Sequence, residues 1–213
     1  MRLKLYIDRF DPARDRKGYK QEFKIETEEN ETVLDALIKA WHQDPSLSFR
    51  RSCRSAICGS CALLINREPR LACQSLLKDV ATENSLTLEP MAGFRRLKDL
   101  VVDLQPFFDG LKDIIPWVLT RSDYNGLMSP EDMEKIEKPA TCILCGLCDS
   151  QLGDRRGVSP AAMVKNVRLA LDTRDMMGIV RLQLNQRYPE EMKVFREKLK
   201  NLCPKKIVLP ELD

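Results

Sequence analysis

The first forty residues carry an extended hydrophobic pattern followed by a helical one. Leu3, Leu5 and Ile7 alternate with charged or polar residues, and YKQEFKIETE supplies a second extended stretch, so we expect a β-hairpin. The segment TVLDALIKAW then places apolar residues at helical spacing. Thr32 and Asp35 at its start match a capping box, which predicts a helix that begins just after this threonine.

Extended and turn-forming segments continue up to Pro90. CALLIN and SLTLEP are typical of strands, and NREP predicts a turn before the short RLAC segment. The first hundred residues therefore predict a small mixed sheet with one packed helix. Beyond Pro90, RLKDLVVDLQPFFDGL carries apolar residues at helical spacing and predicts a helix kinked before Pro106. The apolar residues are Leu97, Leu100, Val101, Leu104 and Phe108.

The rest of the chain has helical signals only. Ser129 and Ser159 are each followed by a proline, which is a common way for a helix to begin, and Pro189 predicts the start of a last helix. The sequence contains no internal repeat and no Gly/Ser linker, so we expect the two halves to pack together. We predict an α+β protein with domains at residues 1–95 and 96–213.

Composition excludes several classes of function. The chain has 213 residues, of which 43% are hydrophobic, as in ordinary globular proteins. Its 35 Lys+Arg nearly balance 32 Asp+Glu, and aromatic residues make up only 6%, so nothing indicates nucleic-acid binding. Neither a signal peptide nor an apolar run long enough to span a bilayer is present, so we expect a cytoplasmic protein that reaches a membrane only through partners.

Eight cysteines in such a compartment are more typical of metal ligands or catalytic thiols than of disulfides. Cys53, Cys58, Cys61 and Cys73 have the C-x4-C-x2-C spacing, with a fourth cysteine twelve residues on, of plant-type [2Fe–2S] proteins. Gly59 suits such a loop because backbone N–H groups can approach the cluster sulfurs there. The alternative is a structural zinc site, although zinc favours paired C-x2-C spacings.

The second cysteine group lies in the helical half. Cys142, Cys145 and Cys148 form C-x2-C-x2-C, and Cys203 is followed by Pro204 far downstream. A compact triplet with a distant Cys-Pro is typical of a [4Fe–4S] site. Cys203 joins this set by elimination, because the eight cysteines then divide into two sets of four. A zinc knuckle fragment remains the alternative for the triplet.

These motifs resemble the iron–sulfur subunit of succinate dehydrogenase and fumarate reductase. The resemblance is carried by DPSLSFRRSCRSAICGSCALLINREPRLACQ, RLKDLVVDL, LMSPEDMEKIEKPATCILCGLC and LALDTRD, which extend over nearly the whole chain. It implies a β-grasp [2Fe–2S] ferredoxin domain followed by an α-helical ferredoxin domain. It also implies a flavoprotein partner that interconverts succinate and fumarate at FAD, so that this chain has no substrate site of its own.

By the same resemblance, the [2Fe–2S] cluster lies nearest the flavin and the [4Fe–4S] cluster comes next. Arg50, Arg51 and Arg54 flank the first cluster loop. We expect them to contact the flavoprotein or to offset the negative charge of the cluster. The equally weighted alternative is that they are solvated arginines at the edge of a loop.

The sequence departs from the family after Cys148. In the family, a third cluster, [3Fe–4S], is held by three cysteines. One of them stands where this chain has Leu152, and the other two lie near the downstream Cys-Pro. Here the segment MKVFREKLKNLCP has no cysteine before Cys203. Leucine has no donor atom for iron, so we expect the third cluster to be absent. The stretch DSQLGDRRG also lacks the tryptophan, and the last helix the histidine, of the family's quinone pocket. The only histidine, His42, is expected on the surface.

Four functional hypotheses follow. The first is an electron-transfer subunit with an unusual outer partner, such as a soluble subunit that carries a cluster or flavin, docked on a basic surface. The second keeps a membrane partner in which another chain binds quinone. In the third, the same two clusters transfer electrons for a different FAD-dependent oxidoreductase, such as a thiol-linked fumarate reductase. The fourth is a binding module that is stabilised by structural zinc and has no redox role. The basic residues proposed for docking are Arg155, Arg156, Lys205 and Lys206.

Overall fold

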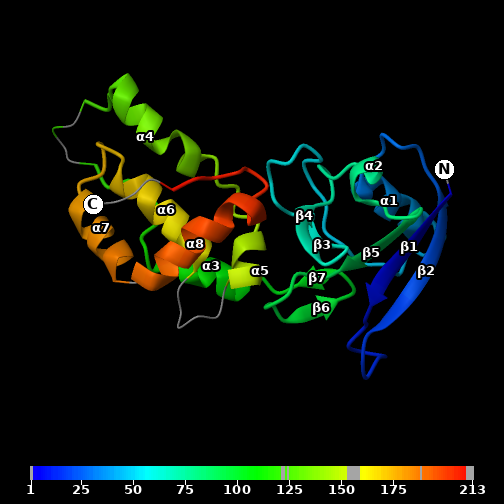
Figure 1. Ribbon diagram of the computed structural model, residues 1–213. Coiled ribbons are helices and arrows are strands. Elements are labelled where there is room, and N and C mark those ends of the chain that lie inside the picture. The colour runs from blue at the N-terminus through cyan, green and yellow to red at the C-terminus, as the bar shows by residue number, and fades with distance from the viewer. Residues whose placement is uncertain (1, 121–122, 124, 153–158, 188, 210–213) are drawn as a thin grey trace. The chain divides into compact units, whose positions relative to one another are not determined.

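The computed structural model describes residues 2–120, 123, 125–152, 159–187 and 189–209 (Figure 1). The chain forms two compact units. The first contains the chain up to Leu104 together with Cys145–Gln151, and the second contains Gln105–Leu144 and the chain from Leu152 onward. Two cysteines of the second group, Cys145 and Cys148, thus belong to the first unit.

The first unit is built on a five-stranded sheet with the strand order β2-β1-β5-β3-β4 (Figure 1). β1 and β2 pair antiparallel with Leu5 opposite Phe23, which confirms the expected hairpin, and β1 pairs with β5 in parallel. Alternate side chains of β1 are buried, as the hydrophobic pattern predicts. The strands are β1 (Arg2–Arg9), β2 (Tyr19–Glu26), β3 (Ala62–Ile65), β4 (Glu68–Leu71) and β5 (Ser85–Glu89).

One helix of three turns packs against the sheet. α1 (Val33–Gln43) contacts β2 and buries its apolar side. The predicted capping box is present, since Asp35 N donates to Thr32 Oγ1 at 3.2 Å and Thr32 N donates to Asp35 Oδ2 at 2.9 Å. His42 is exposed in the last turn, as expected. A further short helix, α2 (Leu77–Val80), follows β4.

The helix predicted over RLKDLVVDLQPFFDGL is wrong in its first half. The chain instead forms a small hairpin of β6 (Arg96–Lys98) and β7 (Val101–Val102), and α3 begins only at Gln105. The cause is Asp99, which has φ of 44° and a buried carboxylate. This carboxylate accepts hydrogen bonds from the backbone of Phe10 and Ser48, and such long-range contacts override helical spacing.

The described residues of the second unit contain helices and connecting segments (Figure 1). Ser129 and Ser159 cap α4 and α6 as predicted, by accepting backbone hydrogen bonds from Asp132 and Ala162. The last helix begins at Pro189 as predicted. The helices are α3 (Gln105–Lys112), α4 (Pro130–Ala140), α6 (Pro160–Ala170), α7 (Gly178–Gln186) and α8 (Pro189–Leu202), while α5 (Leu147–Leu152) begins in the segment that joins the first unit.

A buried arginine organises the core of the second unit. Arg181 on α7 pairs with Asp175 at 3.0 Å and donates to the carbonyls of Ile114 and Trp117. These bonds satisfy a guanidinium that is only 1% exposed. The sequence thus folds as an α+β protein, and none of its described helices is long and apolar enough to cross a lipid bilayer.

Candidate metal centre

The β3–β4 hairpin brings two of the predicted ligands together. Cys61 is buried immediately before β3, and Cys73 follows β4 after one residue. Ala72 N donates to Cys61 O at 3.1 Å, which extends the ladder by one bond, and Cys73 N donates to Cys61 Sγ at 3.4 Å. Because the strands are antiparallel, cysteines beyond their two paired ends meet at the same edge of the sheet.

Backbone amides of the loop point at the cysteine sulfurs. Cys53 Sγ accepts from the amides of Ser55, Ile57 and Cys58 at 3.2–3.4 Å. Ala56 N donates to Cys73 Sγ at 3.3 Å, which ties the loop to the end of the β3–β4 hairpin. Amide donors of this kind stabilise the negative charge of cluster sulfurs. The loop therefore has the donors that an anionic, sulfur-ligated group requires.

The turn conformation of the loop explains how its amides face inward. Arg54 and Ala56 have φ of 58° and 56°, and Gly59 has φ of 71°. Residues that alternate between left-handed and ordinary conformations turn successive N–H groups toward one point, which favours an anion there. Ser60 N continues the pattern by donating to Cys58 Sγ at 3.5 Å.

Two thiols of this group, those of Cys53 and Cys61, differ in their electrostatic surroundings. The backbone amides of Ser55 and Ile57 lower the pKa of Cys53 to about 6, because they favour its thiolate. Burial raises the pKa of Cys61 to about 12, because water is excluded from its thiolate. As a predicted ligand, Cys61 would ionise only when a metal binds it.

The three arginines around this loop have different environments. Arg51 lies over the rings of Trp41 and Phe49, with its Cζ 5.4 and 5.7 Å from their centres. Arg50 is half-buried, and Arg54 is exposed. Ile57, within the loop, is 64% exposed. A role for the arginines at a flavoprotein interface stays a prediction.

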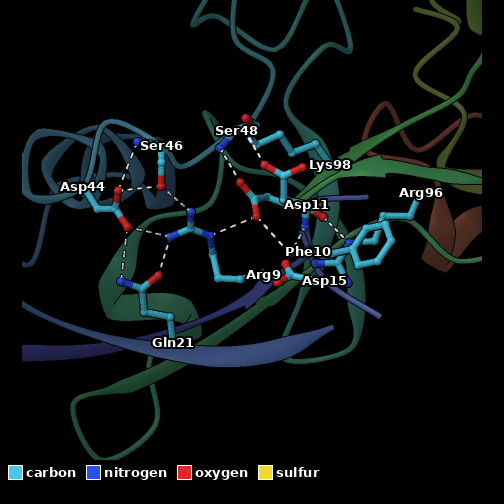
Figure 2. Close-up of polar contacts among 11 residues, drawn as sticks. Arg9, Phe10, Asp11, Asp15, Gln21, Asp44, Ser46, Ser48, Arg96 and Lys98 are labelled. Carbon is cyan, nitrogen blue, oxygen red and sulfur yellow. Dashed lines mark hydrogen bonds and ion pairs between the residues drawn. The ribbon is translucent and has the colours of Figure 1, made fainter. Parts of the chain in front are cut away.

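A buried ion-pair network anchors the chain that leads into the loop (Figure 2). Arg9 donates from Nε to Asp99 Oδ1 and from Nη1 to Asp44 Oδ2, both at 2.9 Å. Figure 2 shows its guanidinium directed toward Asp44 and Ser46, and its Nη2 donates to Ser46 Oγ at 2.8 Å. Asp99 in turn accepts from Ser48 N at 2.8 Å. The cluster loop begins five residues later, so the network fixes its point of departure.

The hydrophobic pattern does not predict this network, although the sequence contains one signal of it. Arg9 continues the inward-facing alternation of Leu3, Leu5 and Ile7, and it is 4% exposed. A charged residue at an inward position of a strand requires a partner of opposite charge. The sequence does not reveal which acidic residue that partner is, because Asp99 is ninety residues away.

The second cysteine group is divided between the two units. Cys145 and Cys148 belong to the first, and Cys142 and Cys203 to the second, so their common ligand set stays a prediction. Cys148 Sγ lies 3.3 Å from Asp149 Oδ2. Lys165 Nζ on α6 donates to the backbone oxygen of Cys142 at 3.1 Å. A cation therefore lies beside one predicted ligand.

Other predicted positions can be placed individually. Leu152 is 8% exposed at the end of α5 and offers no donor atom. Lys206 is exposed and Lys205 is half-buried, just beyond Cys203. Arg155 and Arg156 lie outside the described residues. Among the described residues, no three His, Cys, Asp or Glu side chains lie close enough together to hold a single metal ion. A [2Fe–2S] cluster differs from such a site, because its four cysteine sulfurs are distributed over two irons.

Comparison with known proteins decides the family. A model described as a 2Fe-2S iron-sulfur cluster binding domain matches residues 4–109. The mitochondrial succinate dehydrogenase (ubiquinone) iron-sulfur subunit of Dictyostelium discoideum is 33% identical, over 89% of this chain and 71% of that protein. The fumarate reductase iron-sulfur subunit of Escherichia coli O6:H1 is 32% identical, over 96% of this chain and 87% of that protein. This chain belongs to the iron–sulfur subunit family of succinate dehydrogenase and fumarate reductase.

A solved structure shows the same fold. A chain of the Mycobacterium smegmatis Sdh1 complex in its apo form superposes with a TM-score of 0.81 at 22% identity, over 97% of this chain and 89% of that chain. Family membership makes this chain an electron-transfer subunit of an oxidoreductase complex. It also favours iron–sulfur chemistry over the zinc alternative for the cysteines.

Proposed function

We propose that this chain carries electrons between the FAD of a flavoprotein subunit and an outer partner through two iron–sulfur clusters. A [2Fe–2S] cluster in the N-terminal β-grasp domain would be held by Cys53, Cys58, Cys61 and Cys73. A [4Fe–4S] cluster in an α-helical ferredoxin domain would be held by Cys142, Cys145, Cys148 and Cys203. The clusters supply one-electron carriers, and the protein supplies ligation, hydrogen bonds and spacing.

The observation that carries the proposal is the set of amide–sulfur hydrogen bonds in the first loop. Three amides donate to Cys53 Sγ and one to Cys73 Sγ, all from the stretch between Cys53 and Cys58. A structural zinc site also uses four thiolates, but zinc has no redox chemistry, so the charge of such a site stays constant. The donors fit a cluster whose negative charge rises by one on reduction.

The proposed exit for electrons differs from that of the family. Leu152 takes the place of a [3Fe–4S] ligand, and the chain before Cys203 offers no replacement. We infer that the [4Fe–4S] cluster is the last carrier on this chain. The outer partner then meets the chain near Cys203, where Lys205 and Lys206 would attract an acidic surface. That partner is a further subunit, either soluble or membrane-bound, and the whole complex would lie in the cytoplasm or at its membrane face.

Freeze-quench EPR on the assembled complex tests the proposal. Succinate is mixed anaerobically with the oxidised complex, and the reduced signals of both clusters are followed in time. We expect the [2Fe–2S] signal first and the [4Fe–4S] signal after it, with no [3Fe–4S] signal in the oxidised sample. Reduction by a thiol but not by succinate would assign the same wiring to a different donor, and reduction of neither cluster by any flavin-linked donor would refute the relay.

Two variants make this experiment specific. Cys148→Ala should remove the [4Fe–4S] cluster and stop transfer to the outer partner, while the flavin still reduces the [2Fe–2S] cluster. Lys206→Glu should retain both clusters and slow only the exchange with the outer partner. Unchanged exchange in Lys206→Glu would place the docking surface elsewhere.

A further inference from the structure

Gly59 makes an unusually close contact with a residue of the second cysteine group. It is buried between Cys58 and Cys61 in the first loop. A Cβ atom built on Gly59 would lie 2.7 Å from the Cα and 2.8 Å from the Cβ of Cys145, and 3.2 Å from its backbone nitrogen. Real side chains do not approach backbone atoms at such distances. Only glycine lets these two backbones touch.

The contact is one of several close approaches between the segment Cys145–Gln151 and the rest of the first unit. Gly93 faces the backbone oxygen of Ser150, 3.3 Å from where its Cβ would be. Gly146 lies opposite Leu104 and Phe94, 3.7 Å from where its own Cβ would be. Each of these glycines also has a positive φ, of 75° and 77°. Residues without side chains therefore line the places where this segment approaches most closely.

We infer that Gly59 sets the distance between the two iron–sulfur clusters and thereby the rate at which they exchange an electron. This inference rests on the proposed function, because it requires both clusters. Gly59 follows the ligand Cys58 directly, and it touches the ligand Cys145. A chain of bonded atoms with one van der Waals contact thus connects the two ligand sets. Gly59 is a positioning residue, and it contacts neither cluster through a side chain.

The proposed step transfers a single electron. One electron leaves the reduced [2Fe–2S] cluster and enters the oxidised [4Fe–4S] cluster, so the first is oxidised and the second reduced by the same amount. No bond forms or breaks, and no proton is required. The rate of such a step falls exponentially with the distance between the carriers. A side chain that separates Gly59 from Cys145 should therefore slow this step and leave the reduction of the first cluster unchanged.

The chain offers a matched control for backbone strain. Gly126 has φ of 81°, close to the 71° of Gly59, but nothing lies within 4 Å of where its Cβ would be. Gly126→Ala therefore introduces the strain of an alanine at positive φ without any collision. Gly59→Ala introduces the same strain together with the collision against Cys145. A difference between the two variants isolates the contact.

The test compares the wild-type complex with Gly59→Ala and Gly126→Ala after iron analysis has shown that both clusters are present. Pulsed EPR measures the magnetic interaction between the reduced clusters, and freeze-quench EPR measures how fast each is reduced. We expect a weaker interaction and a severalfold slower [4Fe–4S] reduction in Gly59→Ala alone, with [2Fe–2S] reduction unchanged. Wild-type interaction and rates in Gly59→Ala would overturn the inference.

A second measurement covers a Gly59→Ala variant that fails to assemble its clusters. In the wild-type complex, contact between the ligand loops requires that the two reduced clusters relax each other magnetically. Clusters that are both present and show no mutual relaxation enhancement would overturn the inference without any variant. The proposed function fails separately, if iron analysis shows that the [4Fe–4S] cluster is absent or if the flavin does not reduce the [2Fe–2S] cluster.

Discussion

Arg9 Nε lies 2.9 Å from Asp99 Oδ1, and both side chains are at most 5% exposed. Asp99→Ala leaves the guanidinium buried without this partner and removes the acceptor for Ser48 N. We expect a loss of about 3–5 kcal/mol in the free energy of unfolding, because Arg9 keeps only Asp44 as a charged partner and three donors lose their acceptor. Denaturant unfolding of the purified chain measures the change.

Arg95→Ala is the control for this prediction. Arg95 pairs with Asp103 at 2.9 Å, but its side chain is 75% exposed. Its removal should cost about 0–1 kcal/mol, as is usual for surface ion pairs. Equal losses in Asp99→Ala and Arg95→Ala would show that the buried ion pair stabilises the fold no more than an exposed one does.

Asp44 predicts a specific dependence of stability on pH. Hydrogen bonds from Ser46, and next from Arg9, hold the pKa of the Asp44 carboxyl far below its usual range. A lowered folded-state pKa contributes stability that is complete above the unfolded pKa of about 4 and is lost as the pH falls below it. Asp44→Asn should therefore unfold with a shallower dependence on pH below about 4. Unfolding midpoints measured from pH 3 to 7 test this, and identical slopes would contradict it.

The elements that follow from local rules were predictable from the sequence. The capping box of Thr32 and Asp35 and the Ser-Pro helix starts depend on neighbours within four residues, and the structure confirms them. The hairpin at residues 96–102 was not predictable, because Leu97, Leu100 and Val101 fit a helix as well. Only the buried carboxylate of Asp99, bound to residues far away in the chain, decides between the two.

The candidate site also has features that the sequence predicts and features that depend on the fold. Cysteine spacing predicts which thiols act together, since ligand geometry limits the intervals between them. Spacing does not reveal which amides face the sulfurs, or that Gly59 approaches Cys145, because both depend on how the loop turns. The bounds of helix α7 were not predicted, although this part of the chain was expected to be helical, and the buried Arg181 breaks its apolar pattern.

Leu152→Cys should not create a third cluster. The new thiol would have no companion ligands before Cys203, and one sulfur cannot hold three irons. We expect an unchanged iron content and an oxidised EPR spectrum without a [3Fe–4S] signal. Leu152→Ala controls for the packing lost at this 8% exposed position. A new [3Fe–4S] signal in Leu152→Cys alone would show that hidden ligands exist.

Lys165 should raise the reduction potential of the [4Fe–4S] cluster. Its ammonium donates to the backbone oxygen of Cys142 at 3.1 Å, and a positive charge favours the more negative, reduced cluster. Lys165→Met should lower the potential by on the order of 50 mV, equivalent to about 1 kcal/mol for one electron. Redox titration followed by EPR measures this shift.

Lys112→Met provides the same change of charge at an exposed position, where the ammonium pairs with Asp109. It should leave the potential nearly unchanged, and Lys165→Arg should retain most of the wild-type value. Equal shifts in Lys165→Met and Lys112→Met would mean that general charge, rather than the contact with Cys142, sets the potential.

We expect this chain to carry one [2Fe–2S] cluster, one [4Fe–4S] cluster and no third cluster. Iron quantification combined with EPR of the oxidised and reduced protein tests it most directly. We predict about six irons per chain, two signals on reduction, and no [3Fe–4S] signal on oxidation. An oxidised [3Fe–4S] signal with about nine irons would show a third cluster, and a colourless protein with about two zinc ions would exclude the electron relay.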